Sequence, residues 1–177
     1  MSYFNEEDKS TFLYNKNSEV LYNKLSEICL ENLMLSSDAY VCAVKMNLKG
    51  YKVLHRHLSK KFQDLYLKVQ QDTMKRFDKL MYGAEEYAHY TYKSLRQHLT
   101  EWNVKLEKYL VDVGQIMRGI FEQDGYISCV AQEVQKTLYK NLLMNKKNIK
   151  ILDELNWNES EIRNLDKELY NKMKHVY

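Results

Sequence analysis

The chain of 177 residues has no proline and only five glycines. Proline interrupts helices, and turn-rich β-folds need turn residues at short, regular intervals, so this shortage argues against a β-sandwich or barrel and favours long helices. The chain also lacks an apolar run near the roughly 20 residues of a membrane span, and its first residues lack a signal-peptide pattern. We therefore expect an all-α, cytoplasmic protein with no membrane partner.

Cysteine is also scarce. Cys29, Cys42 and Cys129 are an odd number, lie far apart and form no CxxC pair. Disulfide frameworks use even numbers of cysteines, and structural zinc sites use closely spaced pairs. Small buried thiols are the expected role of these residues.

Apolar residues recur with a 3.6-residue period in several long stretches. This pattern predicts helices over residues 18–46, 51–80, 95–121 and 127–152, and a last helix over 158–175. Ser18 is the expected N-cap of the first helix, and Gly50 the expected left-handed residue at its turn. Residues expected on the inner side of the first helix are Leu21, Leu25, Ile28, Leu33, Leu35, Val41 and Val44.

The order of the helices predicts how they pack. The four long helices would each be about 40 Å long, and the connection between the second and the third would contain a short helix over 84–92. Such helices pack most economically as a ferritin-like four-helix bundle. We expect residues 18–152 to form this bundle. Residues 1–17 would be an N-terminal tail that could form a short helix, and residues 153–177 a C-terminal helical extension.

Chemistry-bearing motifs are few. Di-iron bundles use two Glu-x-x-His pairs on long helices, but the only match, Glu86 with His89, lies in the connection. There is no glycine-rich phosphate loop and no nucleophile motif. We therefore expect no di-iron site inside the bundle.

The turn before the second helix carries the most specific pattern. It reads Lys-Met-Asn-Leu-Lys-Gly over residues 45–50, followed by a histidine seven residues after the glycine and an aspartate fifteen residues later. This spacing resembles that of the Dps family, the miniferritins that form hollow dodecamers and protect DNA. The matching positions are Asn47, Lys49, Gly50, His57 and Asp72. The resemblance extends over about residues 18–152.

The resemblance implies a homo-dodecamer with two-fold and three-fold interfaces and iron as its metal. In the family, each site that oxidises Fe(II) takes two histidines from one subunit and an Asp and a Glu from its two-fold partner. His57 and Asp72 match two of these ligands, but Lys45 and Arg76 replace the others. Neither side chain offers a lone pair at neutral pH. We expect an impaired site in which Asp72 pairs with Arg76 or with Lys45 of the partner subunit.

Basic residues bear on DNA binding. Residues 45–80 contain ten Lys or Arg and three Asp, which permits phosphate contact, although a solvated lysine-rich face explains the same pattern. Candidate DNA contacts in the terminal segments are Lys9, Lys16, Lys167, Lys172 and Lys174. Acidic neighbours offset these lysines, so binding would depend on the avidity of twelve copies, and the protein would then be associated with the nucleoid.

Two other functions stay open. One is a working ferroxidase that oxidises Fe(II) with peroxide or oxygen and stores ferric iron, using His57, Asp72 and unconventional ligands. His55 could supply one of these, although it points about 200° around the helix from His57. The other is a helical interaction module that binds no metal.

Overall fold

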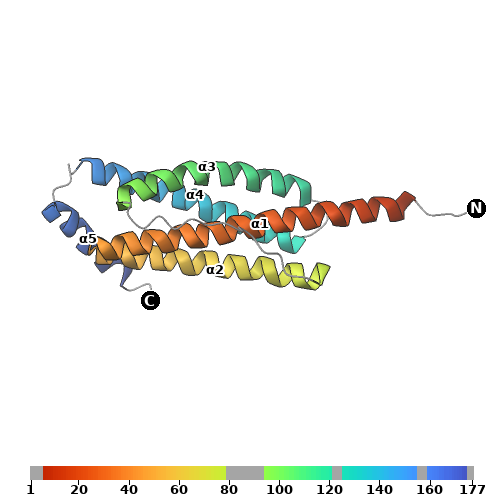
Figure 1. Cartoon of the computed structure of the whole chain (residues 1–177), viewed down its shortest axis with the longest axis horizontal. Helices are drawn as coiled ribbons and strands as arrows, with labels where there is room; N and C mark the ends of the chain where they lie inside the picture. Colours follow the sequence, from red (N-terminus) through yellow and green to blue (C-terminus); the bar gives the residue numbers. More distant parts are fainter. Residues whose placement is uncertain (1–5, 79–93, 121–124, 155–158, 175–177) are drawn as a thin grey trace, which may run out of the picture.

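The computed structural model describes residues 6–78, 94–120, 125–154 and 159–174 and, in the first helix, side chains from Ser18 onward. Its elements are α1 (Glu6–Lys45), α2 (Lys49–Phe77), α3 (Leu95–Ile120), α4 (Gly125–Glu154) and α5 (Glu159–Met173) (Figure 1). No strand occurs in these ranges. The all-α prediction is confirmed, and the bounds of α2 to α5 lie close to those predicted.

The first helix differs from the prediction. α1 is continuous from Glu6, so Ser18 is not its N-cap but a buried residue within it. Residues 6–17 contain no proline or glycine, so nothing in the sequence ends the helix there. The 40 residues of α1 span about 60 Å, and the first turns extend past the other helices (Figure 1). Lys9 and Lys16 belong to this extension, and their side chains lie outside those described.

Contacts between helices define the directions of the chain. Glu31 accepts a hydrogen bond from Tyr109, and the Leu35 carbonyl oxygen lies 2.8 Å from His98 Nε2, so α1 and α3 are antiparallel. α2 follows α1 after a short turn and returns alongside it (Figure 1). α2 and α3 therefore run parallel, and the end of α2 lies at the opposite end of the bundle from the start of α3.

The turn between α1 and α2 corrects a second expectation. Asn47 adopts the left-handed conformation with φ 56°, while Gly50 lies inside the first turn of α2. Asparagine tolerates this conformation better than most residues. Gly50 serves close packing instead, because a Cβ there would lie 2.2 Å from the Asp166 carbonyl oxygen and 2.7 Å from the Tyr170 nitrogen of α5.

α5 also caps α2. The N-cap residue Leu48 makes no side-chain cap hydrogen bond. The Tyr51 backbone N–H instead donates to Asp166 Oδ1 at 2.9 Å, and Asp166 is buried. A carboxylate suits this place because the first N–H groups of a helix are unpaired and the helix dipole is positive there. The predicted C-terminal extension is thus a helix fixed to the α1–α2 turn.

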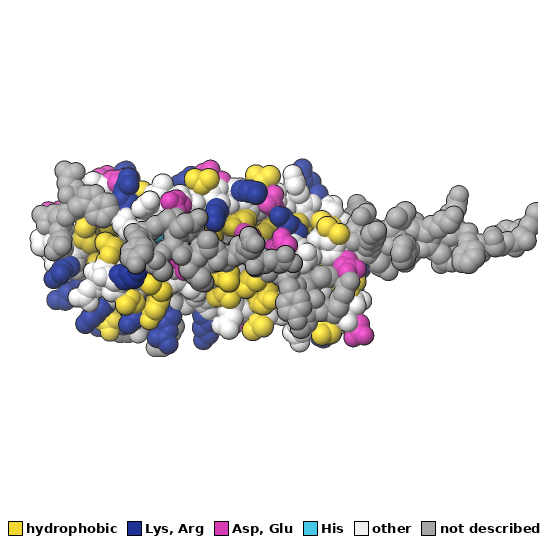
Figure 2. All heavy atoms as spheres, in the orientation of Figure 1, with side chains coloured by type: hydrophobic (Ala, Val, Ile, Leu, Met, Phe, Trp, Pro, Cys, Tyr) yellow, Lys and Arg dark blue, Asp and Glu magenta, His cyan; other side chains and the backbone are white. Residues whose placement is uncertain are grey.

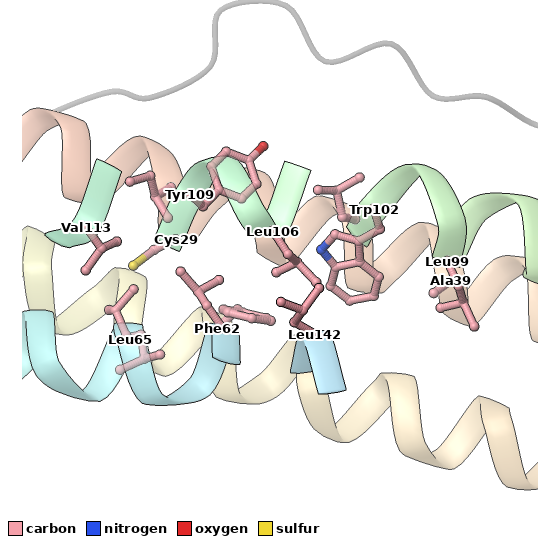
Figure 3. Packing of buried hydrophobic residues seen from close by; sticks show 14 of the residues in the cluster. Cys29, Ala39, Phe62, Leu65, Leu99, Trp102, Leu106, Tyr109, Val113 and Leu142 are labelled. Carbon is pink, nitrogen blue, oxygen red and sulfur yellow. The ribbon is translucent and has the colours of Figure 1, made fainter. Parts of the chain in front are cut away.

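The core is a continuous apolar cluster between the helices. Phe62 of α2 lies near Leu142 of α4 and Leu106 of α3, and Leu65 and Trp102 lie further along the cluster in opposite directions (Figure 3). All five are buried. In a core packed this closely, truncating a large side chain to alanine lowers the free energy of unfolding by several kcal/mol, on the order of 3–5 kcal/mol for an aromatic ring.

Some predicted core positions are exposed. Val41 and Val44 of α1 are 45% and 47% exposed, although the periodicity put them on the inner side. Cys29 and Cys42 are buried free thiols as expected, whereas Cys129 is exposed. The predicted short helix over 84–92 lies outside the described residues. In the described ranges, every helix is too short or too polar to cross a membrane.

Candidate functional site

The two predicted metal ligands lie along one edge of α2. His57 and Asp72 are both half-buried, and fifteen residues of helix separate them by about 22 Å. His57 lines a groove between α2 and α4. Asp72 is one turn beyond Lys68, which bonds to α4, so it belongs to the same side of α2. Its Oδ2 atom is buried and has no hydrogen-bond partner in the described part of the chain.

The two replaced positions lie far apart in one chain. Lys45 is exposed in the last turn of α1, and Arg76 is exposed in the last turn of α2. The Arg76 guanidinium lies 5.8 Å from the ring centre of Tyr22 and 5.9 Å from that of Phe77, within cation–π range. Across the described ranges, no three His, Cys, Asp or Glu side chains come close enough to hold a metal ion.

The groove between α2 and α4 has a volume of about 470 Å³. Glu133 of α4 lines it and accepts from Lys61 Nζ, another lining residue, at 2.9 Å and from Lys68 Nζ, outside the lining, at 3.2 Å. The hydrogen bond from Lys61 is the main cause that lowers the pKa of Glu133. The residues lining the groove are His57, Leu58, Lys61, Glu133, Lys136, Thr137, Lys140, Asn141 and Met144.

Asn141 is the unusual member of this lining. It is 1% exposed, and neither its Nδ2 nor its Oδ1 has a hydrogen-bond partner among the described residues. Burying an amide without partners costs free energy, so such a group calls for an explanation. Our sequence reasoning missed it. The available signal was a polar stripe of Asn141, Asn145 and Asn148, at the i, i+4, i+7 spacing of one helix face.

His55 has a structural position. It is fully buried, and its ring centre lies 6.2 Å from that of Trp102. Burial, with a smaller contribution from His98, lowers the pKa of His55 to about 3, so its imidazole is neutral at physiological pH. Enclosed in the core, it does not share the groove with His57.

The C-terminal lysines lie at a basic end of the molecule. Lys167, Lys172 and Lys174 are exposed on and just after α5. Because α5 packs on the first turn of α2, these lysines share this end with Lys49. Figure 2 shows dark blue Lys and Arg side chains gathered at the end where α5 lies.

No protein-family model matches the chain, and no curated protein matches it. The resemblance to the Dps family therefore stays a prediction from the sequence.

Proposed function

We propose that this chain is a subunit of a Dps-like dodecameric cage in the cytoplasm, which protects DNA and sequesters iron with an impaired ferroxidase site. The observation that carries the proposal is the parallel direction of α2 and α3 between two antiparallel hairpins. A bundle with one such long connection has the topology of ferritin-like proteins. The motif around Gly50, His57 and Asp72 adds the specific resemblance.

Exposed apolar side chains support assembly. Three valines of α1 and two residues of α2 are between 41% and 64% exposed in the single chain: Val20, Val41, Val44, Leu67 and Met74. Apolar groups on the α1–α2 hairpin are stabilised when a second copy removes them from water. Twelve copies related by two-fold and three-fold axes would cover such surfaces.

The charges on α1 and α2 support the loss of oxidation chemistry. Lys45 and Arg76 bring two cations to positions that hold ligands in the family, and like charges repel Fe(II). Asp72 retains one carboxylate, which in the assembled cage would pair with one of these cations. Iron would then be held elsewhere on the inner surface and not oxidised at the two-fold interface.

DNA contact would come from the basic end. Lys167, Lys172 and Lys174 are exposed on and just after the helix that packs on the first turn of α2, the turn that carries Lys49, and each lysine attracts phosphate without regard to base sequence. Repetition on twelve subunits converts weak contacts into strong binding through avidity.

An electrophoretic shift of plasmid DNA across salt concentration tests this function. We expect binding that weakens steeply between about 50 and 200 mM salt and is lost when Lys167, Lys172 and Lys174 are all changed to Glu. Lys105→Glu with Lys108→Glu, on the exposed side of α3, is the control for negative charge added elsewhere on the surface and should keep binding. No shift at low salt, or equal loss in both variants, would contradict the DNA role.

The rate of Fe(II) oxidation distinguishes the proposed impaired site from a working ferroxidase. Fe(II) mixed anaerobically with the protein and then with peroxide should be oxidised at the protein-free rate. Oxidation far above that rate, abolished by His57→Ala, would contradict the impaired site and favour the ferroxidase.

A further inference from the structure

The groove between α2 and α4 has features that the proposed cage does not use. Its lining contains three lysines against one glutamate, a formal net charge of +2 with His57 neutral. Lys61 is engaged with Glu133, which leaves Lys136 and Lys140 as the cations on the rim. These two are exposed and four residues apart, so they lie side by side on α4.

The inner wall of the groove is of a different kind. Leu58 and Met144 are partly buried apolar side chains that pack against the core. Asn141 also lines the groove, and both its amide atoms are buried and have no hydrogen-bond partner in the described residues. An amide left this way is stabilised by a ligand that brings a hydrogen-bonding group to it.

We propose that this groove binds a small organic phosphate. The phosphate would lie between the ammonium groups of Lys136 and Lys140, since lysine binds phosphate as a compact point charge. The apolar body would cover Leu58 and Met144, and a rotation of the buried Asn141 side chain toward the groove would bring its amide to a polar atom of the ligand. The volume of about 470 Å³ suits a small molecule, and the net charge of +2 matches a dianionic phosphomonoester.

Phenyl phosphate is a suitable probe because it joins a dianionic head to an apolar ring. We expect it to bind the full chain at least tenfold more tightly than inorganic phosphate, benzoate or benzyl alcohol, each of which lacks part of this combination. In NMR spectra of the protein with labelled methionine methyl groups, the chemical shift of Met144 should change as phenyl phosphate is added and then reach a plateau. The signal of Met74, which is exposed and does not line the groove, should stay fixed.

Variants assign the site. Lys136→Ala and Lys140→Ala should each weaken phenyl phosphate binding roughly tenfold, while Lys147→Ala, an exposed lysine of the same helix outside the groove, should leave it unchanged. Asn141→Leu should also weaken binding without lowering thermal stability, since it removes a buried unpaired amide. If Asn141→Leu fails to fold, the two lysine variants decide alone, because both positions are exposed.

Three results would overturn the proposal. In the first, the Met144 signal does not shift at millimolar phenyl phosphate. In the second, neither Lys136→Ala nor Lys140→Ala changes the binding of phenyl phosphate. In the third, benzoate binds as tightly as phenyl phosphate. The site lies within one chain, so its failure leaves the cage proposal standing, and loss of the cage leaves the site testable.

Discussion

The two sides of α2 are built differently. Toward α1, polar side chains pair with one another: the buried Gln70 Nε2 donates to the buried Ser26 Oγ at 2.6 Å, and the half-buried Ser59 Oγ donates to the buried Ser36 Oγ at 3.0 Å. Such pairs require the two helices to meet at one register, because each partner would otherwise be left buried and unpaired.

Toward α4, the same helix uses partly exposed ion pairs. Lys61 and Lys68 converge on Glu133, whose side chain is 35% exposed, and exposed pairs contribute little to stability. Beside them Asn141 is buried with no hydrogen-bond partner in the described part of the chain, and a groove stays open. The comparison teaches that the α1 side of α2 fixes the fold, whereas the α4 side leaves room for a ligand.

The largest expected effect concerns His55, in the core beside Trp102. Its pKa is lowered from 6.5 to about 3 in the folded chain, so only the unfolded chain takes up this proton as the pH falls below 6.5. Stability is therefore full above that pH and decreases toward pH 3, by about 3 kcal/mol at pH 4. His55→Leu should remove this loss. Urea unfolding of both proteins from pH 7 to 4 measures it, and parallel curves would contradict the account.

Gly50 tests the junction that holds the end of α2 to α5. Gly50→Ala should lower the free energy of unfolding by about 2 kcal/mol, because the new Cβ would overlap the backbone of α5 at Asp166 and Tyr170. Gly114→Ala is the matched control. Its Cβ would meet nothing within 4 Å, so it should raise stability by about 1 kcal/mol. Equal changes in the two variants, measured by urea unfolding, would show that α5 does not pack this closely.

Gln70 tests the paired side directly. Gln70→Ala leaves the buried Ser26 hydroxyl without its partner and opens a small cavity, at a cost of about 2 kcal/mol. The neighbouring Gln71 is exposed, so Gln71→Ala should change the thermal midpoint little. If the two substitutions had the same effect, the α1 side of α2 would not be the more stable side.

Glu133 should give the smallest effect. Glu133→Gln removes both ion pairs to α2 and should cost at most about 1 kcal/mol at pH 7. The lowered pKa of Glu133 means that this contribution is present above pH 4.5 and is lost as the pH falls through the lower folded value. Thermal unfolding at two salt concentrations checks it, since added salt should shrink the difference. A loss as large as that of Gln70→Ala would remove the contrast between the two sides.

The helices of the bundle were largely predictable from the sequence. Apolar spacing and the lack of proline located α2, α3 and α4 within a few residues, because local periodicity determines which side of a helix is buried. The predicted start of the first helix at Ser18 was wrong. A residue with good N-cap propensity does not start a helix when the residues before it contain no helix breaker. Val41 and Val44 show that an apolar residue near a helix end can stay exposed in a single chain.

The groove could not be predicted in the same way. It depends on how far apart α2 and α4 lie, and residues far apart in the sequence, such as Lys61 and Lys140, share no local pattern. The role of Gly50 could not be predicted either. The position excludes a Cβ because the backbone of Asp166 and Tyr170, more than 100 residues away in the sequence, packs against it. Long-range contacts of this kind are set by tertiary packing.

The mass of the particle formed by the full chain in solution tests the central claim most directly. Twelve chains of 21.3 kDa correspond to about 256 kDa for the closed cage. Light scattering coupled to size exclusion should give this single value, unchanged on dilution to micromolar concentration. A monomer or dimer under the same conditions would contradict the cage and favour a helical interaction module.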